Sequence, residues 1–284
     1  MRFTFIRAEK ATWPVRVMCR VLGVSPSGLY AWCKRPNSPR VASDVALGVA
    51  VAECHATSRG TDGSPRVHAD LRAQGIRVGR KRVIRLMRSK GLKGSKRRGW
   101  VRTTEADPSA VAAPNLLERD FTASKPNERW VSDVTYLRTP AGWLYLAAIV
   151  DLYSRRIVGW ALSPYNDRKL AKMGLLDALR RRRPGEGFLH HTDRGSPYTS
   201  AEYQKLLDDS GALCSMSRSG NCLDNAAMES WFATLKSERG EAFESFHEAR
   251  RQLFDFIEVF YKRQRRHSAL GYLSPPDFEA VGVA

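Results

Sequence analysis

The sequence predicts an α/β fold preceded by an all-α region, and three observations support this. The chain has 284 residues, which is enough for about two domains. Up to residue 92 the apolar residues recur at helical spacing, whereas runs of β-branched and aromatic residues begin at residue 130. The charge is uneven: residues 1–114 hold 23 Lys and Arg against seven Asp and Glu, and residues 115–284 hold 24 against 22. A basic helical part therefore precedes a nearly neutral α/β part.

The composition excludes several classes of protein. An apolar fraction of 43% with 10% aromatic residues is typical of a folded chain and not of a disordered basic tail. No apolar run approaches 18 residues and residues 1–10 lack a signal-peptide pattern, so we expect a cytoplasmic protein with no membrane partner. The five cysteines form no CxxC pair, which argues against a zinc finger. The basic part predicts a nucleic-acid partner; a surface that only aids solubility is the alternative.

Residues 13–35 have the pattern of a helix–turn–helix unit. Apolar residues recur at helical spacing before Gly23, which allows a tight turn, and Ser25 and Pro26 suit the start of a second helix. In DNA-binding units of this kind the early residues of the second helix face the major groove. The candidate DNA contacts in this segment are Ser25, Ser27 and Tyr30. An ordinary helical hairpin is the alternative interpretation.

Three further helices are predicted over residues 45–55, 65–73 and 80–90. In the third of them, three apolar residues form one stripe and basic residues cover most of the remaining surface. Cations gathered on one helix suit contacts with DNA phosphates, which carry no base specificity; a solvated charged face is the alternative. The candidate contacts are Arg80, Lys81, Arg82 and Arg85.

The second half of the chain predicts a β-sheet covered by α-helices. Residues 130–137, 143–150 and 156–163 predict three strands of an antiparallel meander, and the second has the continuous apolar run of a strand buried on both faces. Shorter strands are expected over residues 188–193 and 213–219. The predicted helices cover residues 167–183, 199–210, 224–239 and 246–263, with a Thr199–Glu202 capping box and Asp224 as a further cap. This order of elements is typical of an α/β sheet.

Three acidic residues stand in apolar surroundings, where an isolated carboxylate is costly. Asp133 lies inside the first strand, Asp193 ends a short strand, and Glu229 lies within an apolar helix. Converging carboxylates repel one another, and Mg²⁺ would neutralise them because it takes oxygen ligands and leaves room for water and phosphate. Each acid taken singly is equally well a turn or surface residue, as we expect for Asp151 at the head of a turn.

The residues around these acids resemble a known family. The segments WVSDVTY (residues 130–136), HTDRGSPY (191–198) and SRSGNCLDNAAMESWFATLKSE (217–238) resemble integrase-core transposases of bacterial insertion sequences. More narrowly, they look like the OrfB product of the family that encodes its transposase in two overlapping frames. Between Asp193 and Glu229 lie 35 residues, which matches the DD(35)E pattern of that superfamily. The tail (261–279) and the front segment VLGVSPSGLYAW are also similar to the family.

The resemblance implies a ribonuclease-H-like mixed-sheet catalytic core. Asp133, Asp193 and Glu229 would hold two Mg²⁺ or Mn²⁺ ions and support cleavage and strand transfer at the ends of the element. Lys236 lies seven residues after Glu229 on the same helix face, where the family has a basic residue that contacts terminal DNA. Asn225 and His191 are expected to line the site. For His191, packing within the strand or a phosphate contact is favoured over a metal role.

Four segments follow from these inferences. We expect a helix–turn–helix segment over residues 1–40, a second DNA-binding domain over 41–98, a linker over 99–124, and the catalytic core with its helical tail over 125–284. The resemblance implies DNA as partner, both terminal inverted repeats and target. It also implies the upstream-frame (OrfA) product, alone or fused, a homo-oligomer on DNA, and a location at the bacterial nucleoid. The alternatives are a DNA-binding regulator with an unused core and a ribonuclease-H-like nuclease.

Overall fold

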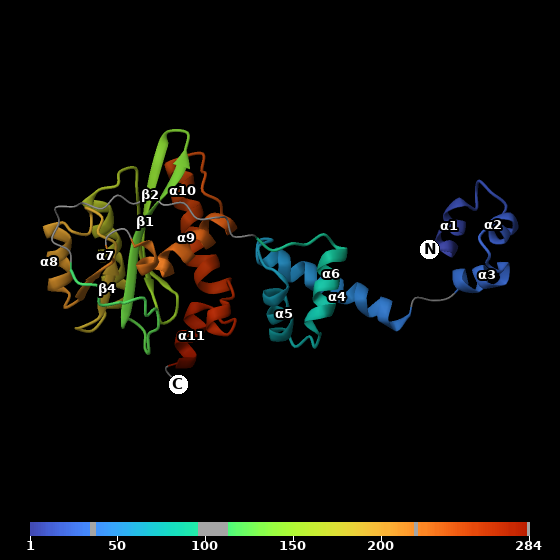
Figure 1. Ribbon diagram of the computed structural model, residues 1–284, viewed down its shortest axis with the longest axis horizontal. Helices are drawn as coiled ribbons and strands as arrows, with labels where there is room; N and C mark the ends of the chain where they lie inside the picture. Colours follow the sequence, from blue (N-terminus) through green and yellow to red (C-terminus); the bar gives the residue numbers. More distant parts are fainter. Residues whose placement is uncertain (35–37, 96–112, 219–220, 283–284) are drawn as a thin grey trace. The chain divides into compact units, whose positions relative to one another are not determined.

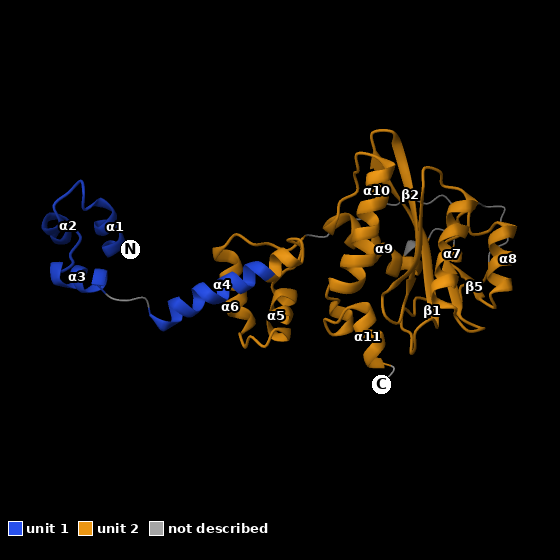
Figure 2. Cartoon of the chain, turned by 180° about the vertical axis from the view of Figure 1, so that it is seen from behind, with its two compact units in different colours: residues 1–53 blue, residues 54–284 orange. Residues whose placement is uncertain are grey.

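The computed structural model describes residues 1–34, 38–95, 113–218 and 221–282 (Figure 1). The chain divides into two compact units, residues 1–53 and 54–284, which are considered separately (Figure 2). Most of the expected linker, residues 99–112, lies outside the described residues. Within the described ranges, no helix is both long enough and apolar enough to cross a membrane.

The first unit contains a small three-helix cluster. Its helices are α1 (Arg2–Glu9), α2 (Val15–Val21) and α3 (Pro26–Lys34). They enclose the buried side chains of Ile6, Met18, Cys19 and Leu29. Gly23 has φ +62° between α2 and α3, and the Ser25 hydroxyl accepts a hydrogen bond from the Gly28 amide at 2.9 Å. The turn and the cap predicted for a helix–turn–helix unit are therefore confirmed.

The second helical block consists of α4 (Pro39–Thr57), α5 (Ser64–Ala73) and α6 (Arg80–Ser89). Helix α4 begins six residues before the predicted start and crosses the boundary between the two units. Apolar residues at helical spacing are buried along α5 and α6, namely Val67, Leu71, Val83, Leu86 and Met87. Gly75 and Gly91 adopt positive φ angles just after these helices, which confirms the predicted stops.

The rest of the second unit is built on a five-stranded mixed sheet (Figure 1). Its strands are β1 (Arg129–Thr139), β2 (Gly142–Asp151), β3 (Ile157–Ser163), β4 (Leu189–Thr192) and β5 (Leu213–Met216). The order is β3-β2-β1-β4-β5; β1, β2 and β3 are antiparallel, whereas β4 pairs in parallel with both β1 and β5. This arrangement is the predicted mixed sheet of a ribonuclease-H-like fold.

Helices cover both faces of the sheet, as Figures 1 and 2 show. One layer consists of α7 (Arg168–Arg182) and α8 (Ala201–Asp209); the other consists of α9 (Ala226–Glu238), α10 (Phe246–Phe254), the π-helical η2 (Asp255–Gln264) and α11 (Pro275–Gly282). On β1, Trp130 packs in the core shared with α7 and α8, whereas Val131 and Leu137 pack in the core shared with α9. Since alternate side chains share a face, Asp133 belongs to the α9 face.

Three local expectations are wrong. The Thr199–Glu202 capping box does not form, because α8 begins one residue later and the Thr199 hydroxyl donates to the carbonyl of Ser196 instead. Asp224 does not cap a helix, because its buried carboxylate binds arginine side chains and α9 follows only after a 3-10 turn, η1 (Cys222–Asn225). The strand over residues 143–150 is not buried throughout, since Trp143 is 46% exposed.

Candidate active site

Asp133 and Asp193 lie level with each other on neighbouring strands. β1 and β4 are parallel, and their last paired residues are Val131 and His191. Each aspartate comes two residues after its paired residue, so both side chains are on the face that α9 covers. Neighbouring strands lie about 4.8 Å apart. The pairing of strand residues that are 60 positions apart in sequence therefore brings the two carboxyl groups together.

Glu229 reaches this pair from α9. The helix begins at Ala226, so Glu229 lies in its first turn. Burial raises the pKa of Asp133 well above its ordinary value, and the carboxylates of Asp193 and Glu229 raise it further. Burial also raises the pKa of Asp193. Asp193 and Glu229 are thus close enough to Asp133 to destabilise its charged form.

Backbone amides hold the two aspartates in place. The Asp133 Oδ1 atom accepts from the Val134 amide at 2.7 Å, and the Asp193 Oδ1 atom accepts from the Gly195 amide at 2.9 Å. A Cβ atom on residue 195 would lie only 2.9 Å from that same Oδ1 atom. A side chain at residue 195 would therefore push this carboxylate out of its place. In each aspartate, Oδ2 accepts no hydrogen bond from the described residues.

The segment before α9 is fastened on both sides. The Asn225 amide nitrogen donates to the carbonyl of Ser132 at 3.2 Å, directly beside Asp133 on β1. The buried Asp224 carboxylate receives Arg218 at 2.9 Å and Arg119 at 2.8 Å. The guanidinium of Arg218 lowers the pKa of Asp224, so this carboxyl group stays ionised. These contacts fix where α9 starts and hence where Glu229 points.

His190 and His191 are wholly buried in β4. The His190 ring is hydrogen-bonded to the Tyr203 hydroxyl at 2.8 Å, and the two ring nitrogens of His191 are bonded to Ser215 at 2.8 Å and Ser217 at 3.1 Å. Burial lowers the pKa of His190 to about 3 and that of His191 to about 4, so both rings are neutral at pH 7. This geometry favours the packing role over the metal role for His191.

Lys236 lies two turns beyond Glu229 and faces the far end of β1. Its ammonium group sits 4.6 Å from the centre of the Tyr136 ring and 3.9 Å from a carboxylate oxygen of Glu241. Burial lowers the pKa of Lys236. The predicted basic residue is thus on the helix that carries Glu229, and it lies against the strand that carries Asp133.

Sequence reasoning missed two side chains next to Lys236. Trp143 packs edge-on against Tyr136 with 5.0 Å between ring centres, and the Arg138 guanidinium lies 5.5 Å from the centre of the Trp143 ring. Cations interleaved with exposed aromatic rings suit single-stranded or splayed DNA. The turn at residues 140–142 is a sequence signal that the end of this hairpin is exposed. The apolar run that begins at Trp143, however, predicts a strand buried on both faces.

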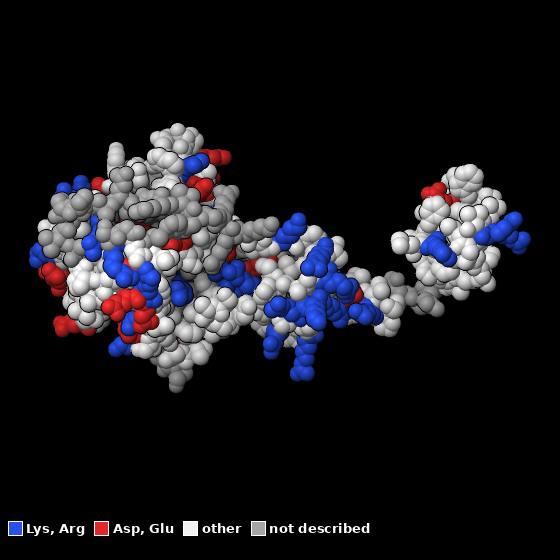
Figure 3. All heavy atoms as spheres, in the orientation of Figure 1, with Lys and Arg blue, Asp and Glu red and all other residues white. Residues whose placement is uncertain are grey.

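The candidate DNA contacts lie on two helical segments. The side chains of Ser25, just before α3, and of Ser27 and Tyr30 on α3 are all exposed. On α6, Arg80, Lys81 and Arg85 are exposed and Arg82 is half-buried. Figure 3 shows Lys and Arg side chains gathered over the segment that carries α6. A hollow of about 360 Å³ at the turn before α6 adds two cations that the sequence analysis did not single out, Arg72 and Arg77.

Family models and solved structures match along the chain. An integrase core domain matches residues 123–222, a second integrase core model matches residues 210–275, and an HTH-like domain matches residues 43–100. A simian T-cell lymphotropic virus intasome, solved with a PP2A regulatory subunit, is 12% identical with TM-score 0.46, covering 81% of this chain and 74% of its own. The HTLV-2 integrase catalytic core solved with magnesium is 14% identical with TM-score 0.40, covering 55% and 97%.

Relatives in sequence cover nearly the whole chain. A protein of Shigella sonnei, described as the insertion element IS600 uncharacterized 31 kDa protein, is 43% identical over 263 residues, which is 92% of this chain and 97% of its own. The transposase InsF for insertion sequence IS3A of Escherichia coli is 41% identical over 288 residues, covering all of both chains. With this identity over its full length, and with an integrase core and an HTH-like domain, the chain belongs to the family of integrase-core transposases encoded by bacterial insertion sequences.

Proposed function

We propose that this transposase cuts and rejoins DNA at the ends of its element through one centre made of Asp133, Asp193 and Glu229. The observation that carries the proposal is the placement of these acids. The β1–β4 register sets the two aspartates level, and burial, together with the charges of Asp193 and Glu229, raises the pKa of Asp133. Such carboxylates cost folding energy unless a cation compensates them. A cluster of this kind is maintained for chemistry.

A divalent cation fits this donor set. Carboxylate oxygens are the ligands that Mg²⁺ and Mn²⁺ prefer, and each aspartate keeps its Oδ2 atom without a hydrogen bond among the residues that the structure describes. Within those same residues, no group of three or more His, Cys, Asp and Glu side chains is placed so that it could hold a metal ion as it stands. When bound, two ions would activate the attacking oxygen and stabilise the leaving oxygen of a phosphodiester. We assign the holding of both ions to the three acids.

The other residues position DNA at this centre. Lys236 binds a phosphate near the reacting end, since it stands two turns from Glu229 and its charge is held against Tyr136. Asn225 fixes the start of α9 against β1, beside Asp133. His191 holds β4 to β5 and to residue 217 at the edge of the site.

DNA is bound by helices α3 and α6, which precede the catalytic core in sequence. Phosphates are bound by α6 through Arg80, Lys81, Arg82 and Arg85. Base edges are reached from the start of α3, by Ser25, Ser27 and Tyr30. In this division DNA is bound by residues 1–40 and 41–98. The linker of residues 99–124 joins them to the catalytic core, residues 125–284, which carries out the reaction. The substrates are the terminal inverted repeats and a target DNA. The enzyme works as a homo-oligomer on DNA in the bacterial cytoplasm, at the nucleoid, together with or fused to the upstream-frame product.

A strand-transfer assay tests this function. The protein, alone and fused to the upstream-frame product, is incubated with Mg²⁺ and labelled DNA that carries the ends of the element. We expect joined products that disappear in Asp193→Ala, with DNA binding retained. Joining by the fused form alone would make this chain the catalytic part of a larger enzyme. Nicking of any DNA without joining would identify a nuclease, and binding without chemistry would identify a regulator; either result overturns the proposal.

A further inference from the structure

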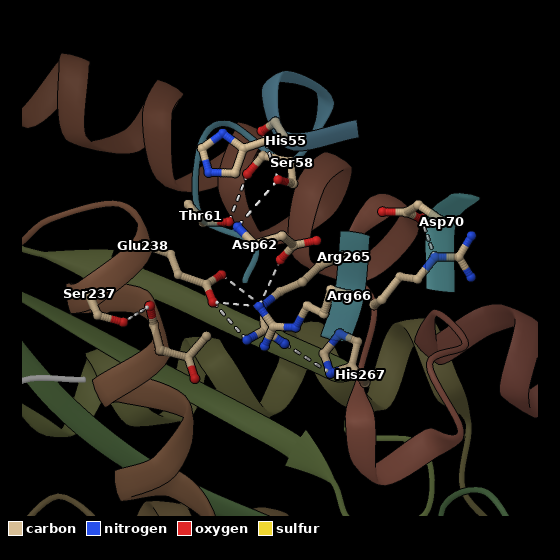
Figure 4. Close-up of polar contacts among 12 residues, drawn as sticks. His55, Ser58, Thr61, Asp62, Arg66, Asp70, Ser237, Glu238, Arg265 and His267 are labelled. Carbon is tan, nitrogen blue, oxygen red and sulfur yellow. Dashed lines mark hydrogen bonds and ion pairs between the residues drawn. The ribbon is translucent and has the colours of Figure 1, made fainter. Parts of the chain in front are cut away.

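The catalytic helix α9 ends on a buried carboxylate that two separate segments bind. Glu238 is the last residue of α9, and its side chain is 6% exposed. Arg265, just after η2, binds it through two hydrogen bonds, Nε to Oε2 at 2.7 Å and Nη2 to Oε1 at 2.8 Å. Arg66, on α5, reaches Oε1 at 3.3 Å. Figure 4 shows both guanidinium groups converging on this one carboxylate.

Arg66 joins the DNA-binding helices to the catalytic helix. The same Nη1 atom that contacts Glu238 also binds the Asp62 carboxylate at 2.9 Å, and the Asp62 side chain is 3% exposed. Two carboxylates and two guanidinium groups therefore share one largely buried network between α5 and the end of α9 (Figure 4). A guanidinium fork imposes orientation as well as attraction, because its donors match carboxylate oxygens in only a few geometries.

Further arginine bridges join the same two parts of the chain. Arg59, just after α4, binds Asp255 at 2.6 Å, and its guanidinium lies 4.7 Å from the centre of the Phe260 ring. Arg266 binds Asp70 of α5. The next residue, His267, is buried beside Arg265 and fastened to the Tyr261 carbonyl at 3.2 Å. The tail that the sequence analysis matched to the family is thus the element that locks α5 and α9 together.

This network connects the helix that carries Glu229 with the helices that carry the candidate DNA contacts. Glu229 and Glu238 are nine residues apart on α9, which is about 13 Å along the helix and on nearly opposite sides of it. One side therefore presents a carboxylate to the active site while the other side anchors the helix. At the DNA-binding end, α5 packs on α6, whose outer surface carries the cations assigned to phosphates.

We propose that Glu238 is a positioning residue: with Arg66 and Arg265 it sets where DNA held by α6 enters the active site. The proposal rests on the proposed function, since it assumes that α6 holds DNA and that Glu229 serves the reaction. The network fixes the distance between the phosphates bound by α6 and the three acids. That distance determines which phosphodiester is cut.

The sharpest variant is Arg66→Gln, because it removes the contact between α5 and Glu238 and leaves the Glu238–Arg265 pair and the Arg266–Asp70 bridge in place. Glu238→Gln removes the carboxylate that both Arg66 and Arg265 bind. The matched control is Glu202→Gln, which removes one carboxylate from the exposed pair between Lys172 on α7 and Glu202 on α8. Strand transfer, the positions of cleavage at nucleotide resolution, DNA affinity and amide hydrogen exchange are measured for each full-length protein.

We expect Arg66→Gln to reduce transfer at the correct end about 10- to 100-fold and to spread the cuts over neighbouring phosphodiesters. Affinity for end DNA should stay within about twofold, because the α6 cations are untouched. Hydrogen exchange should quicken in α5 and leave β1–β3 unchanged. The control should match wild type in every measurement.

Three results separate failure of this proposal from failure of the proposed function. If wild type cuts and Arg66→Gln cuts the same bond at the same rate, the positioning role is wrong and the function stands. If the variant loses rate but every remaining cut falls at the wild-type position, the network is only structural. If wild type itself neither cuts nor joins, the proposed function has failed first. Should Glu238→Gln not fold, Arg66→Gln alone decides.

Discussion

Replacing Gly195 with alanine should disable the reaction without unfolding the protein. An added Cβ atom would lie 2.9 Å from Oδ1 of Asp193, whereas such contacts normally exceed about 3.4 Å. The backbone at residue 195 does not have a positive φ, so alanine adds no backbone strain. The carboxylate must therefore retreat by about half an ångström. A misplacement of that order costs about 10-fold to 100-fold in rate, which is about 1.4–2.7 kcal/mol of transition-state stabilisation.

The assay is single-turnover strand transfer, with thermal unfolding measured in parallel. Gly185→Ala is the matched control, because a Cβ atom there meets nothing within 4 Å. We expect Gly195→Ala to lose rate while its melting temperature stays within about 3 °C of wild type. Wild-type activity in Gly195→Ala would refute the reasoning, since it would mean that the position of the Asp193 carboxylate does not matter.

Three other predictions follow from the same geometry. Gly159→Ala should lower the free energy of unfolding by about 1–3 kcal/mol in urea, because its Cβ atom would lie 2.4 Å from a backbone oxygen of α7; wild-type stability would contradict the tight packing of β3 on α7. Lys236→Gln should reduce the slope of log affinity against log salt by about one, the value for one lost phosphate contact; an unchanged slope would remove Lys236 from the interface. Asp133→Asn should stabilise the metal-free protein at neutral pH. Because its pKa is raised by folding, the Asp133 carboxyl group makes wild type less stable as the pH rises from about 4 through that pKa. The stability gained by Asp133→Asn should therefore vanish near pH 3, roughly one unit below the ordinary pKa of an aspartate. A gain that does not change with pH would contradict this reasoning.

Sequence patterns predicted the elements well because the signals are local. The β1–β3 meander follows from strand-like runs joined by short turns, and the ends of α5 and α6 follow from Gly75 and Gly91. Local chemistry failed where a tertiary partner intervened. Asp224 has the residue type of a helix cap, but two arginines offer its carboxylate stronger, charge-assisted hydrogen bonds.

The sequence named the members of the candidate site but not their geometry. Their apolar surroundings and the resemblance to the transposase family singled out Asp133, Asp193 and Glu229, but only the β1–β4 register explains why the first two lie level. The network at Glu238 left no sequence signal, since Arg66 lies 172 residues away and any of the 47 Lys and Arg residues was an equal candidate. Contacts of that separation depend on how whole domains dock, which periodicity does not encode.

The most direct test of the central claim is whether the three acids act as one unit. Single-turnover strand transfer with Mg²⁺ should be measured for Asp133→Asn, Asp193→Asn, Glu229→Gln and the pairwise double variants. A shared centre predicts that each single variant loses about a thousandfold or more and that the double variants lose little beyond that. An acid whose removal costs less than about tenfold, or losses that multiply in the double variants, would contradict a single catalytic centre.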